Sequence, residues 1–336
     1  MRYASVCSGV EAPTVAWHPI GWEPVFFSEI EKFPSAVLQH HYPHVPNYGD
    51  MTNYKEWPDD QSISLLVGGT PCQSFSVAGL RKGLADPRGN LMLTFLAVAK
   101  KYNPQWIVWE NVPGVLSSNE GRDFGAFLSA LGECGYGFAY RVLDAQYFGV
   151  AQRRRRVFVV GYLGDWRRAA AVLFERESLS GHPAPSRQTR EEIAKCLTSR
   201  VGSAYDAQTE QFVTDQERVN TITASYGTGG VDYETKPLVF GAQNSSSQGD
   251  SVSEHVTPTL DKSKTPAVMS ELAVRRLTPI ECERLQGFPD NYTQIPWRNK
   301  DAEDCPDGPR YKAMGNSMAV PVMRWIGERI DLVRTL

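Results

Sequence analysis

The chain lacks a hydrophobic run long enough to cross a membrane, and it lacks paired cysteines. Of its 336 residues 41% are hydrophobic, yet no apolar run approaches the ~18 residues of a membrane-spanning helix. The six cysteines are scattered and none forms a C-x-x-C pair, so neither a zinc site nor a disulfide framework is expected. The first residues enter an apolar segment without a signal-peptide pattern. We therefore expect a cytoplasmic protein that binds no metal.

The chain also lacks an excess of positive charge. Its net charge is −3, whereas nucleic-acid-binding proteins are often basic because phosphate contacts dominate their affinity. Positive charge is concentrated in one run, residues 153–156, all of which are arginine. Alone, such a run is typical of a solvated face. Because the apolar residues 157–160 follow directly, we expect these arginines at the entrance of a buried strand, close to the ligands of the sheet.

The first half of the chain alternates apolar segments of strand length with segments of helix length. This alternation predicts an α/β fold, with a mostly parallel sheet covered on both faces. The expected strands are residues 3–7, 24–28, 63–67, 105–109, 138–143 and 157–162, and the expected helices are residues 32–41, 90–102 and 123–134. Further on, Thr278-Pro279-Ile280-Glu281 predicts a helix start with a capping box, and residues 320–333 predict a packed terminal helix.

Residues that can carry chemistry follow the expected strands. Cys72 lies in the segment GGTPCQSFS, residues 68–76, where two glycines free the backbone and a proline stiffens it just before the thiol. An accessible thiolate is a nucleophile, although the segment alone is also compatible with a structural turn. Ligands of parallel sheets bind beyond the carboxyl ends of the strands. The Cys72 loop, Glu29 and Glu110 should therefore meet at one edge.

The first fifty residues favour an adenosine-type cofactor. The loop Cys7-Ser8-Gly9 separates a strand from a helix, and such glycine turns place nucleosides on backbone N–H groups. Glu29 follows about 20 residues later, where an acid binds ribose hydroxyls. Asp50 could accept a hydrogen bond from an adenine amino group. Singly, each of these residues is more often part of a turn or a surface acid.

A polar region separates the two ends of the chain. Residues 194–269 are rich in Ser, Thr, Gln, Asn and Gly, with only short β-like pieces. Such side chains can read the edges of bases. A loop-rich insertion or a partly disordered segment explains the composition equally well.

With these motifs in order, the chain resembles the cytosine-5 DNA methyltransferase family of bacterial or phage type, over nearly its whole length outside residues 165–272. Residues 68–76 are similar to its Pro-Cys nucleophile motif, and Glu110-Asn111-Val112 to its Glu-Asn-Val motif. The other similar segments are residues 86–91 (Arg-Gly-x-Leu), 152–156 (Gln-x-Arg-x-Arg), 276–289, which brace the target-recognition region, and 314–317, whose Asn-Ser contact the cofactor.

The resemblance implies a Rossmann-like sheet of the S-adenosylmethionine-dependent methyltransferases with a smaller, irregular, β-rich target-recognition domain. Residues 1–165, completed by 310–336, would form the catalytic, cofactor-binding domain, and residues 166–309 the target-recognition domain. Double-stranded DNA would lie in the cleft between them. The enzyme is expected to act as a monomer, and a cognate restriction endonuclease is the further partner that such systems can have.

The resemblance also implies the reaction and its residues. A methyl group would pass from S-adenosylmethionine to carbon 5 of a flipped-out cytosine in a specific duplex sequence, through a covalent adduct with Cys72. The expected catalytic residues are Cys72, Glu110, Arg154 and Arg156. The expected cofactor-binding residues are Ser8, Gly9, Glu29, Ile30, Asp50, Met51, Pro71, Leu91, Asn316 and Ser317. The expected substrate-binding residues are Gln73, Ser74, Ser76 and Asn111, of which Asn111 should also order the Pro-Cys loop.

The first loop departs from the family pattern. Glu11 and Ala12 stand where family members often have glycine. A carboxylate there would repel the cofactor's carboxylate unless it points away or binds the amino group. Alternatives to the main hypothesis are a tRNA cytosine-5 methyltransferase and a catalytically inactive DNA-binding relative. A nicotinamide oxidoreductase would fit the first loop alone, and nothing downstream supports it.

Overall fold

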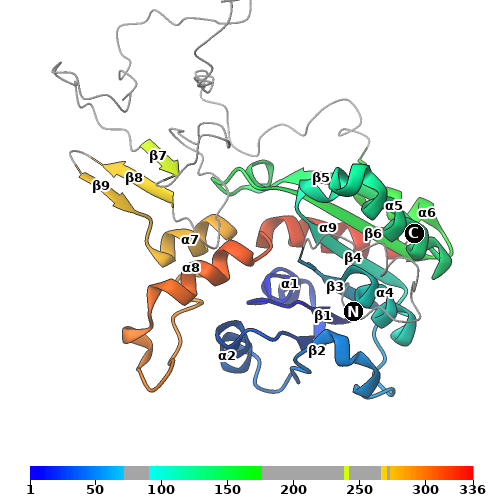
Figure 1. Ribbon diagram of the computed structural model, residues 1–336, viewed down its shortest axis with the longest axis horizontal. Helices are drawn as coiled ribbons and strands as arrows, with labels where there is room; N and C mark the ends of the chain where they lie inside the picture. Colours follow the sequence, from blue (N-terminus) through cyan, green and yellow to red (C-terminus); the bar gives the residue numbers. More distant parts are fainter. Residues whose placement is uncertain (72–90, 176–237, 242–265, 271–272, 336) are drawn as a thin grey trace, which may run out of the picture.

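A six-stranded sheet with helices on both faces forms the centre of the molecule, and a small three-stranded sheet stands apart from it (Figure 1). This computed structural model describes residues 1–71, 91–175, 238–241, 266–270 and 273–335. Among them no helix is long and apolar enough to cross a membrane.

The order of strands in the large sheet is β2-β1-β3-β4-β6-β5. The strands are β1 (Arg2–Val6), β2 (Glu23–Ser28), β3 (Leu65–Gly68), β4 (Trp106–Asn111), β5 (Tyr136–Asp144) and β6 (Arg155–Leu163). All pair in parallel except β6, which runs antiparallel to both β4 and β5. Because β6 is reversed, its first residues lie beside the last residues of β4, with Val157 opposite Asn111 and Phe158 opposite Glu110. The arginine run therefore reaches the carboxyl edge of the parallel strands.

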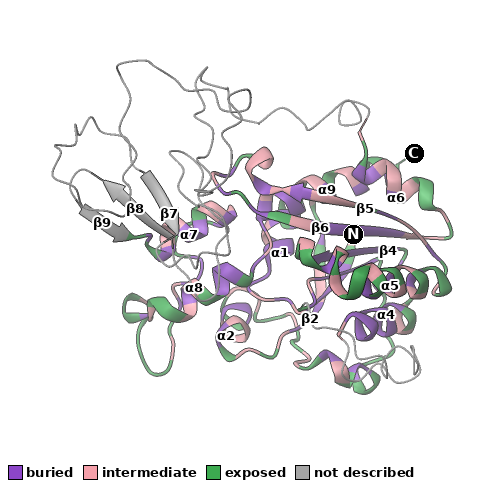
Figure 2. Cartoon of the chain, turned by 45° about the horizontal axis from the view of Figure 1, so that its top comes forward, coloured by how far each residue is buried: buried purple, intermediate pink, exposed green. Residues whose placement is uncertain are grey.

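Helices cover the sheet on two faces, and each face has its own hydrophobic core (Figure 2). The helices are α1 (Ala12–Trp17), α2 (Lys32–His41), α4 (Leu91–Tyr102), α5 (Arg122–Glu133), α6 (Trp166–Leu173), α7 (Pro279–Gln286), α8 (Asp307–Asn316) and α9 (Val320–Arg334). Successive strand side chains point to opposite faces, so Tyr3 enters one core and Ala4 the other. Burial on both sides explains why these strands are continuous apolar runs rather than alternating ones.

Short 3-10 helices fill several connections. They are η1 (His18–Ile20), η2 (Met51–Glu56), η4 (Pro113–Leu116), η5 (Ser118–Gly121), η6 (Ala145–Phe148) and η8 (Ala302–Asp304).

The mostly parallel sheet covered on both faces is confirmed, and so are its predicted elements within about two residues. The helix over residues 32–41 has the predicted bounds. Gly135, at φ 86°, follows the C-cap residue Cys134 of α5 in the left-handed conformation that glycine favours at helix ends. The capping box of α7 is present, with Thr278 and Glu281 each accepting from the other's backbone N–H. Strands β5 and β6 both extend slightly beyond their predicted bounds, residues 138–143 and 157–162, because they pair with each other along their whole length.

Parts of the segment assigned to target recognition pack against the large sheet. Helix α6 lies against β5, β6 and α9. After β7 (Leu238–Gly241), β8 (Pro266–Ser270) and β9 (Ala273–Arg276), which form the small antiparallel sheet, Leu277 and Phe288 enter the core that contains Tyr3. Tyr292 donates a hydrogen bond to the Val10 carbonyl (2.9 Å) and stacks on His41. Most of residues 176–265 lie outside the described part, so the domain boundaries remain a prediction.

Candidate active site

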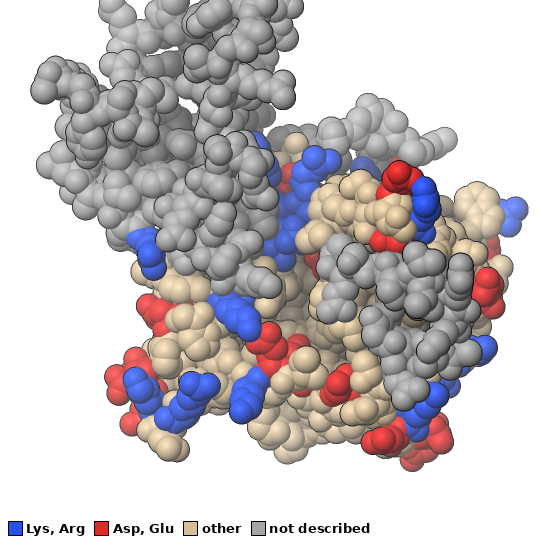
Figure 3. All heavy atoms as spheres, viewed as in Figure 1, with Lys and Arg blue, Asp and Glu red and all other residues tan. Residues whose placement is uncertain are grey.

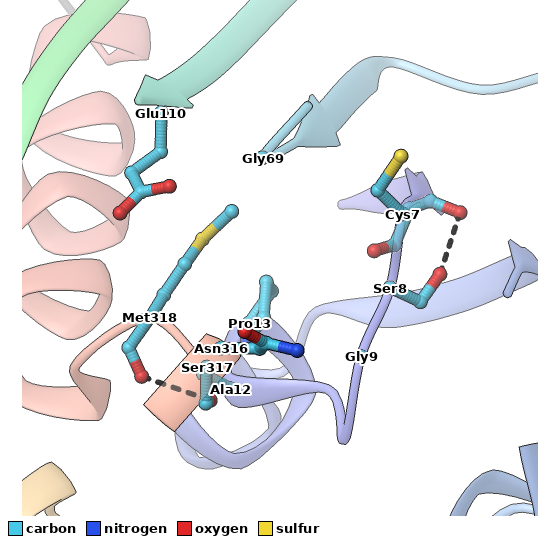
Figure 4. A pocket seen from close by; sticks show the side chains of 11 residues that line it. Cys7, Ser8, Gly9, Ala12, Pro13, Gly69, Glu110, Asn316, Ser317 and Met318 are labelled. Atoms are coloured by element: carbon cyan, nitrogen blue, oxygen red, sulfur yellow. Dashed lines mark hydrogen bonds between the residues drawn. The ribbon is translucent and has the colours of Figure 1, made fainter. Parts of the chain in front are cut away.

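A cavity opens at the carboxyl edge of the sheet, where β1, β3 and β4 end (Figure 4). Its lining residues are Ser5, Cys7, Ser8, Gly9, Ala12, Pro13, Gly69, Glu110, Asn316, Ser317 and Met318. The edge thus brings together five predicted site residues from both ends of the chain: Ser8, Gly9, Glu110, Asn316 and Ser317. The reason is the α/β topology, which places strand-end loops at one edge.

The first loop is shaped by left-handed backbone conformations. Cys7 (φ 49°), Gly9 (φ 56°) and Glu11 (φ 65°) all have positive φ, which is unusual for residues other than glycine. The Ser8 hydroxyl donates to the Ser5 carbonyl (3.0 Å) and steadies the turn. A Cβ atom added at Gly9 would meet nothing within 4 Å. Open space therefore lies above the loop, where a ligand can approach the backbone.

Glu29 is tied to this loop. Its carboxylate accepts hydrogen bonds from the backbone N–H groups of Gly9 (2.8 Å) and Glu31 (2.7 Å). Burial raises the pKa of Glu29, while these two bonds oppose the rise. The next residue, Ile30, is 69% exposed, a large apolar side chain without cover beside the loop. The Glu29 carboxylate and the apolar surface of Ile30 are therefore adjacent, which is the combination that binds the ribose and the base of a nucleoside.

Asp50 and Met51 follow at the same end of the sheet. Asp50 caps η2 and accepts hydrogen bonds from the Thr52 backbone N–H (2.9 Å) and hydroxyl (2.8 Å). Part of its capacity to accept hydrogen bonds from a ligand is therefore already used. Met51 is buried, and its sulfur lies 3.4 Å from the Cys7 sulfur. Cys7 was not among the predicted site residues, although its place directly before Ser8-Gly9 was a signal. Burial raises the pKa of the Cys7 thiol to about 12, with Glu29 and Asp50 adding to the rise, so the thiol is a neutral contact surface.

Glu110 is the acid of the cavity. It is the penultimate residue of β4, is 8% exposed, and has its Oε1 3.1 Å from the Nε of Arg156. Burial raises the pKa of Glu110, and the cations Arg156 and Arg154 oppose that rise. The effect of burial is the larger one, so the pKa of Glu110 is raised and this carboxyl holds a proton more readily than an exposed glutamate does.

Arg154 directly precedes β6 and Arg156 is its second residue, and the charges of both act on Glu110. Arg154 is buried and donates to the carbonyls of Ser317 (2.6 Å) and Gly315 (3.4 Å). Burial, and then the neighbouring Arg156, lower the pKa of Arg154. Arg154 therefore fixes the Asn316-Ser317 segment to the start of β6, while Arg156 holds Glu110.

Asn111 organises the chain just before Cys72. Its Nδ2 donates to the Thr70 carbonyl (2.9 Å), and its Oδ1 accepts from the Val112 backbone N–H (2.8 Å). Trp109 Nε1 donates to the Thr70 hydroxyl (3.0 Å). The expectation that Asn111 orders the entry to the Pro-Cys loop is consistent with these bonds.

Other predicted residues lie away from the cavity or outside the described part. Pro71 is exposed, and Leu91 begins α4 and packs partly against the core beneath it; neither lines the cavity. Cys72, Gln73, Ser74 and Ser76 lie outside the described residues, and their roles stay predictions. Among the described residues no group of His, Cys, Asp and Glu could hold a metal ion.

Glu11, the departure from the family pattern, faces away from the cavity. It is fully buried, and its Oε1 accepts from the Thr14 hydroxyl (3.2 Å), which also bonds the Tyr3 hydroxyl (2.6 Å). Burial raises the pKa of Glu11 to about 8. Of the two ways in which this carboxylate could be tolerated, the structure shows the first, in which it points away.

The strand order and the site at the carboxyl edge define an α/β methyltransferase. The family described as C-5 cytosine-specific DNA methylase matches residues 1–331, and the chain belongs to it. The type II methyltransferase M.SsoII of Shigella sonnei is 31% identical, over 91% of this chain and 73% of its own length. A protein of Escherichia phage P1 named DNA N-6-adenine-methyltransferase is 37% identical over 98% of this chain, which spans 61% of that relative's length.

A solved structure agrees on the fold. An E. coli protein described as a prophage-encoded DNA modification methyltransferase aligns over 100% of both chains with a TM-score of 0.62. At 17% sequence identity this likeness concerns the fold alone.

Proposed function

We propose that the protein transfers a methyl group from S-adenosylmethionine to carbon 5 of a cytosine flipped out of a specific duplex DNA sequence, through a transient bond to Cys72. The observation that carries the proposal is one shared cavity. In it the buried acid Glu110, paired with Arg156, faces the glycine loop and the Asn316-Ser317 segment. A proton donor for a base and a binding loop for a cofactor therefore stand at one edge.

The residues at this edge fit S-adenosylmethionine, which when bound supplies an electrophilic methyl group. The open space above Gly9 admits a ligand to the backbone. The Glu29 carboxylate can accept from ribose hydroxyls, with exposed Ile30 and buried Met51 as apolar surface for the adenine. Asn316 and Ser317 close the other side. Glu11, turned beneath the loop, does not repel the cofactor's carboxylate from within the cavity.

The chemistry begins with Cys72. Carbon 5 of cytosine is a poor nucleophile, so the Cys72 thiolate adds to carbon 6 and makes carbon 5 enamine-like. Glu110 donates a proton to ring nitrogen 3 and accepts from the exocyclic amine. Carbon 5 then takes the methyl group, whose bond to the cofactor's sulfur breaks to leave S-adenosylhomocysteine. Loss of the carbon-5 proton, release of the Cys72 thiolate and return of the nitrogen-3 proton to Glu110 restore the aromatic ring.

The chain also has to hold the base out of its helix. Flipping costs a few kcal/mol, repaid by contacts in the pocket. Gln73, Ser74 and Ser76 are proposed to contact the displaced nucleotide, and Arg154 and Arg156 to supply positive charge next to the thiolate. Residues 166–309 are proposed to read the flanking sequence, with the enzyme acting as a cytoplasmic monomer.

Cytosine is a better target than adenine for this edge. The name of the phage P1 relative states adenine N-6 methylation, and that statement concerns the phage protein. The exocyclic nitrogen of adenine needs no covalent addition before methyl transfer. A Pro-Cys thiol and a protonatable Glu110 are the two groups that ring addition needs, and so favour carbon 5 of cytosine.

Two experiments test the proposal. Mass spectrometry of nucleosides from DNA of expressing cells should find 5-methylcytosine, and methylation-sensitive sequencing of the same DNA should give the target site. A duplex carrying 5-fluorocytosine at that site, incubated with enzyme and S-adenosylmethionine, should become covalently attached to Cys72 because fluorine blocks proton loss. Cys72→Ser should bind cofactor but form no adduct. 6-Methyladenine as the sole product, methylation of tRNA alone, or an adduct at another residue would contradict the proposal.

A further inference from the structure

Met318 lines the cavity of the candidate active site, and the proposed reaction gives it no task. It follows the Asn316-Ser317 segment, in the short link between α8 and α9. Of the residues that line this cavity it has the largest apolar side chain, and the others are mostly small or polar. On the face drawn in Figure 3, charged side chains of both signs stand around the central hollow. Met318 therefore supplies apolar surface where the surroundings attract water.

The Met318 side chain extends toward Glu110 (Figure 4). A Cβ atom placed on Gly69 would lie 3.0 Å from Met318 Cε and 3.0 Å from Glu110 Oε2. Both side chains thus reach the same point beside the backbone of Gly69, which leaves that point free because it has no side chain. Arg156 contacts the other carboxylate oxygen, Oε1. The cation and the thioether therefore stand beside different oxygens of the same carboxyl.

The backbone of Met318 is held in place, whereas its side chain can adjust. Arg154 donates to the Ser317 carbonyl (2.6 Å), and the Ser317 hydroxyl donates to the Met318 carbonyl (3.0 Å). The next residue, Ala319, is the N-cap of α9. The Met318 side chain is only partly buried against the core, and it is unbranched. Its end can therefore yield when a base enters and still cover the carboxyl.

The charges around Glu110 favour its ionised form. Arg156 and Arg154, from the start of β6, both lower the pKa of this carboxyl. The Cys7 thiol in the same cavity is neutral, and the described end of β3 and the link between α8 and α9 carry no titratable side chain. Burial nevertheless raises the pKa of Glu110. Exclusion of water is therefore what favours the protonated form, and it requires an apolar neighbour.

We propose that Met318 is a positioning residue, whose thioether covers the Glu110 carboxyl against water so that its proton passes to ring nitrogen 3 of the base. The inference rests on the proposed function, in which Glu110 is the proton donor. A thioether donates no hydrogen bond and accepts only weakly, so it neither competes for this proton nor holds water beside it. Arg156 holds one oxygen of the carboxyl in place, and Met318 keeps the other dry until the base arrives.

The test follows the titration of Glu110 in the full-length chain, both directly and through the reaction. With the glutamate carboxyls isotopically labelled for NMR, the resonance missing from Glu110→Gln belongs to Glu110, and its movement with pH gives the midpoint. Met318→Gln is of similar length but polar, and should lower this midpoint by about one pH unit because water reaches the carboxyl. The fall of kcat/KM at high pH should move down equally. Met318→Leu, which is apolar and of similar volume, should restore both values.

Val320→Ala is the matched control, because Val320 is buried at the start of α9, close to Gly287, and does not line the cavity. It should lower stability without moving the Glu110 midpoint. An equal shift in Val320→Ala would trace the effect to loosened packing and overturn the inference, and so would an unchanged midpoint in Met318→Gln. If the midpoint shifts but the unmodified chain forms no 5-methylcytosine, the proposed function is overturned while the shielding of Glu110 stands.

Discussion

Arg156 Nε lies 3.1 Å from Glu110 Oε1, on two neighbouring strands that run in opposite directions. The contact exists because β6 alone is reversed, so the entrance of β6 adjoins the exit of β4. Burial favours the neutral form of Glu110, and the guanidinium favours the charged form. The two effects together set how readily this carboxyl gives and regains a proton.

Replacing Arg156 should move the pH dependence of methyl transfer. Arg156 and Arg154 both lower the pKa of Glu110, and Arg156 has the larger effect. Arg156→Gln removes that effect, so the pKa of Glu110 should rise further. Since Glu110 must be protonated to donate, the fall of kcat/KM at high pH should shift to higher pH. Rates from about pH 5 to about pH 9 measure this. Arg156→Lys, which keeps the charge, should shift less, and Glu110→Gln should slow transfer by about a hundredfold or more. Identical profiles for all three would refute the role of the pair.

Gly69→Ala should impair the reaction more than it destabilises the fold. A Cβ there would lie 3.0 Å from Glu110 Oε2 and 3.0 Å from Met318 Cε. The methionine end can move freely, whereas a shift of Glu110 also strains its contact with Arg156. We expect a markedly lower kcat and a loss in unfolding free energy of about 1 kcal/mol or less. Gly114→Ala is the control, because its Cβ would meet nothing within 4 Å. Normal kcat in Gly69→Ala would show that Glu110 has more freedom than the structure indicates.

Glu11 should make stability depend on pH. Burial raises its pKa to about 8, whereas the unfolded chain has a glutamate pKa near ~4.3. Between these values the folded chain holds a proton that the unfolded chain has lost. The free energy of unfolding should therefore fall as pH rises, by up to about 1.4 kcal/mol per pH unit, and level off above about pH 8.

Glu11→Gln cannot ionise, so it should lose this slope and gain stability relative to the unmodified chain as pH rises. Urea unfolding at several pH values measures both curves. Parallel curves would mean that Glu11 is not the titrating group.

Arg310→Met should destabilise the C-terminal part strongly. Arg310 and Glu283 are both buried, with 3.2 Å between their charged atoms, and Thr293 donates to the same carboxylate through its backbone N–H (2.9 Å). Removing the cation leaves a buried, unpaired Glu283, at a cost of about 3–5 kcal/mol. Adding Glu283→Gln should recover most of the loss, which chemical denaturation of the single and double variants would measure. No recovery would place the loss in the packing of Arg310.

The sequence by itself determined the local elements. Helix α2 has its predicted bounds, and Thr278 with Glu281 forms the predicted capping box, because both depend on side-chain spacing and on bonds within four residues. The expectation that Glu29 and Glu110 lie at one edge also followed from the sequence, since parallel strands end together. In the structure Glu29 accepts a hydrogen bond from Gly9, which lines the same cavity as Glu110.

Only the tertiary structure decided the direction of β6, because strand direction is set by pairing between segments far apart in the chain. It therefore also decided that Arg156 contacts Glu110 and that Arg154 holds Ser317. It turned Glu11 beneath the loop, where the Thr14 hydroxyl donates to its carboxylate, and brought Lys312 to Glu31. The local sequence around these residues does not predict their contacts. The packing of helices and strands that are distant in the chain brings them together, rather than local conformational preference.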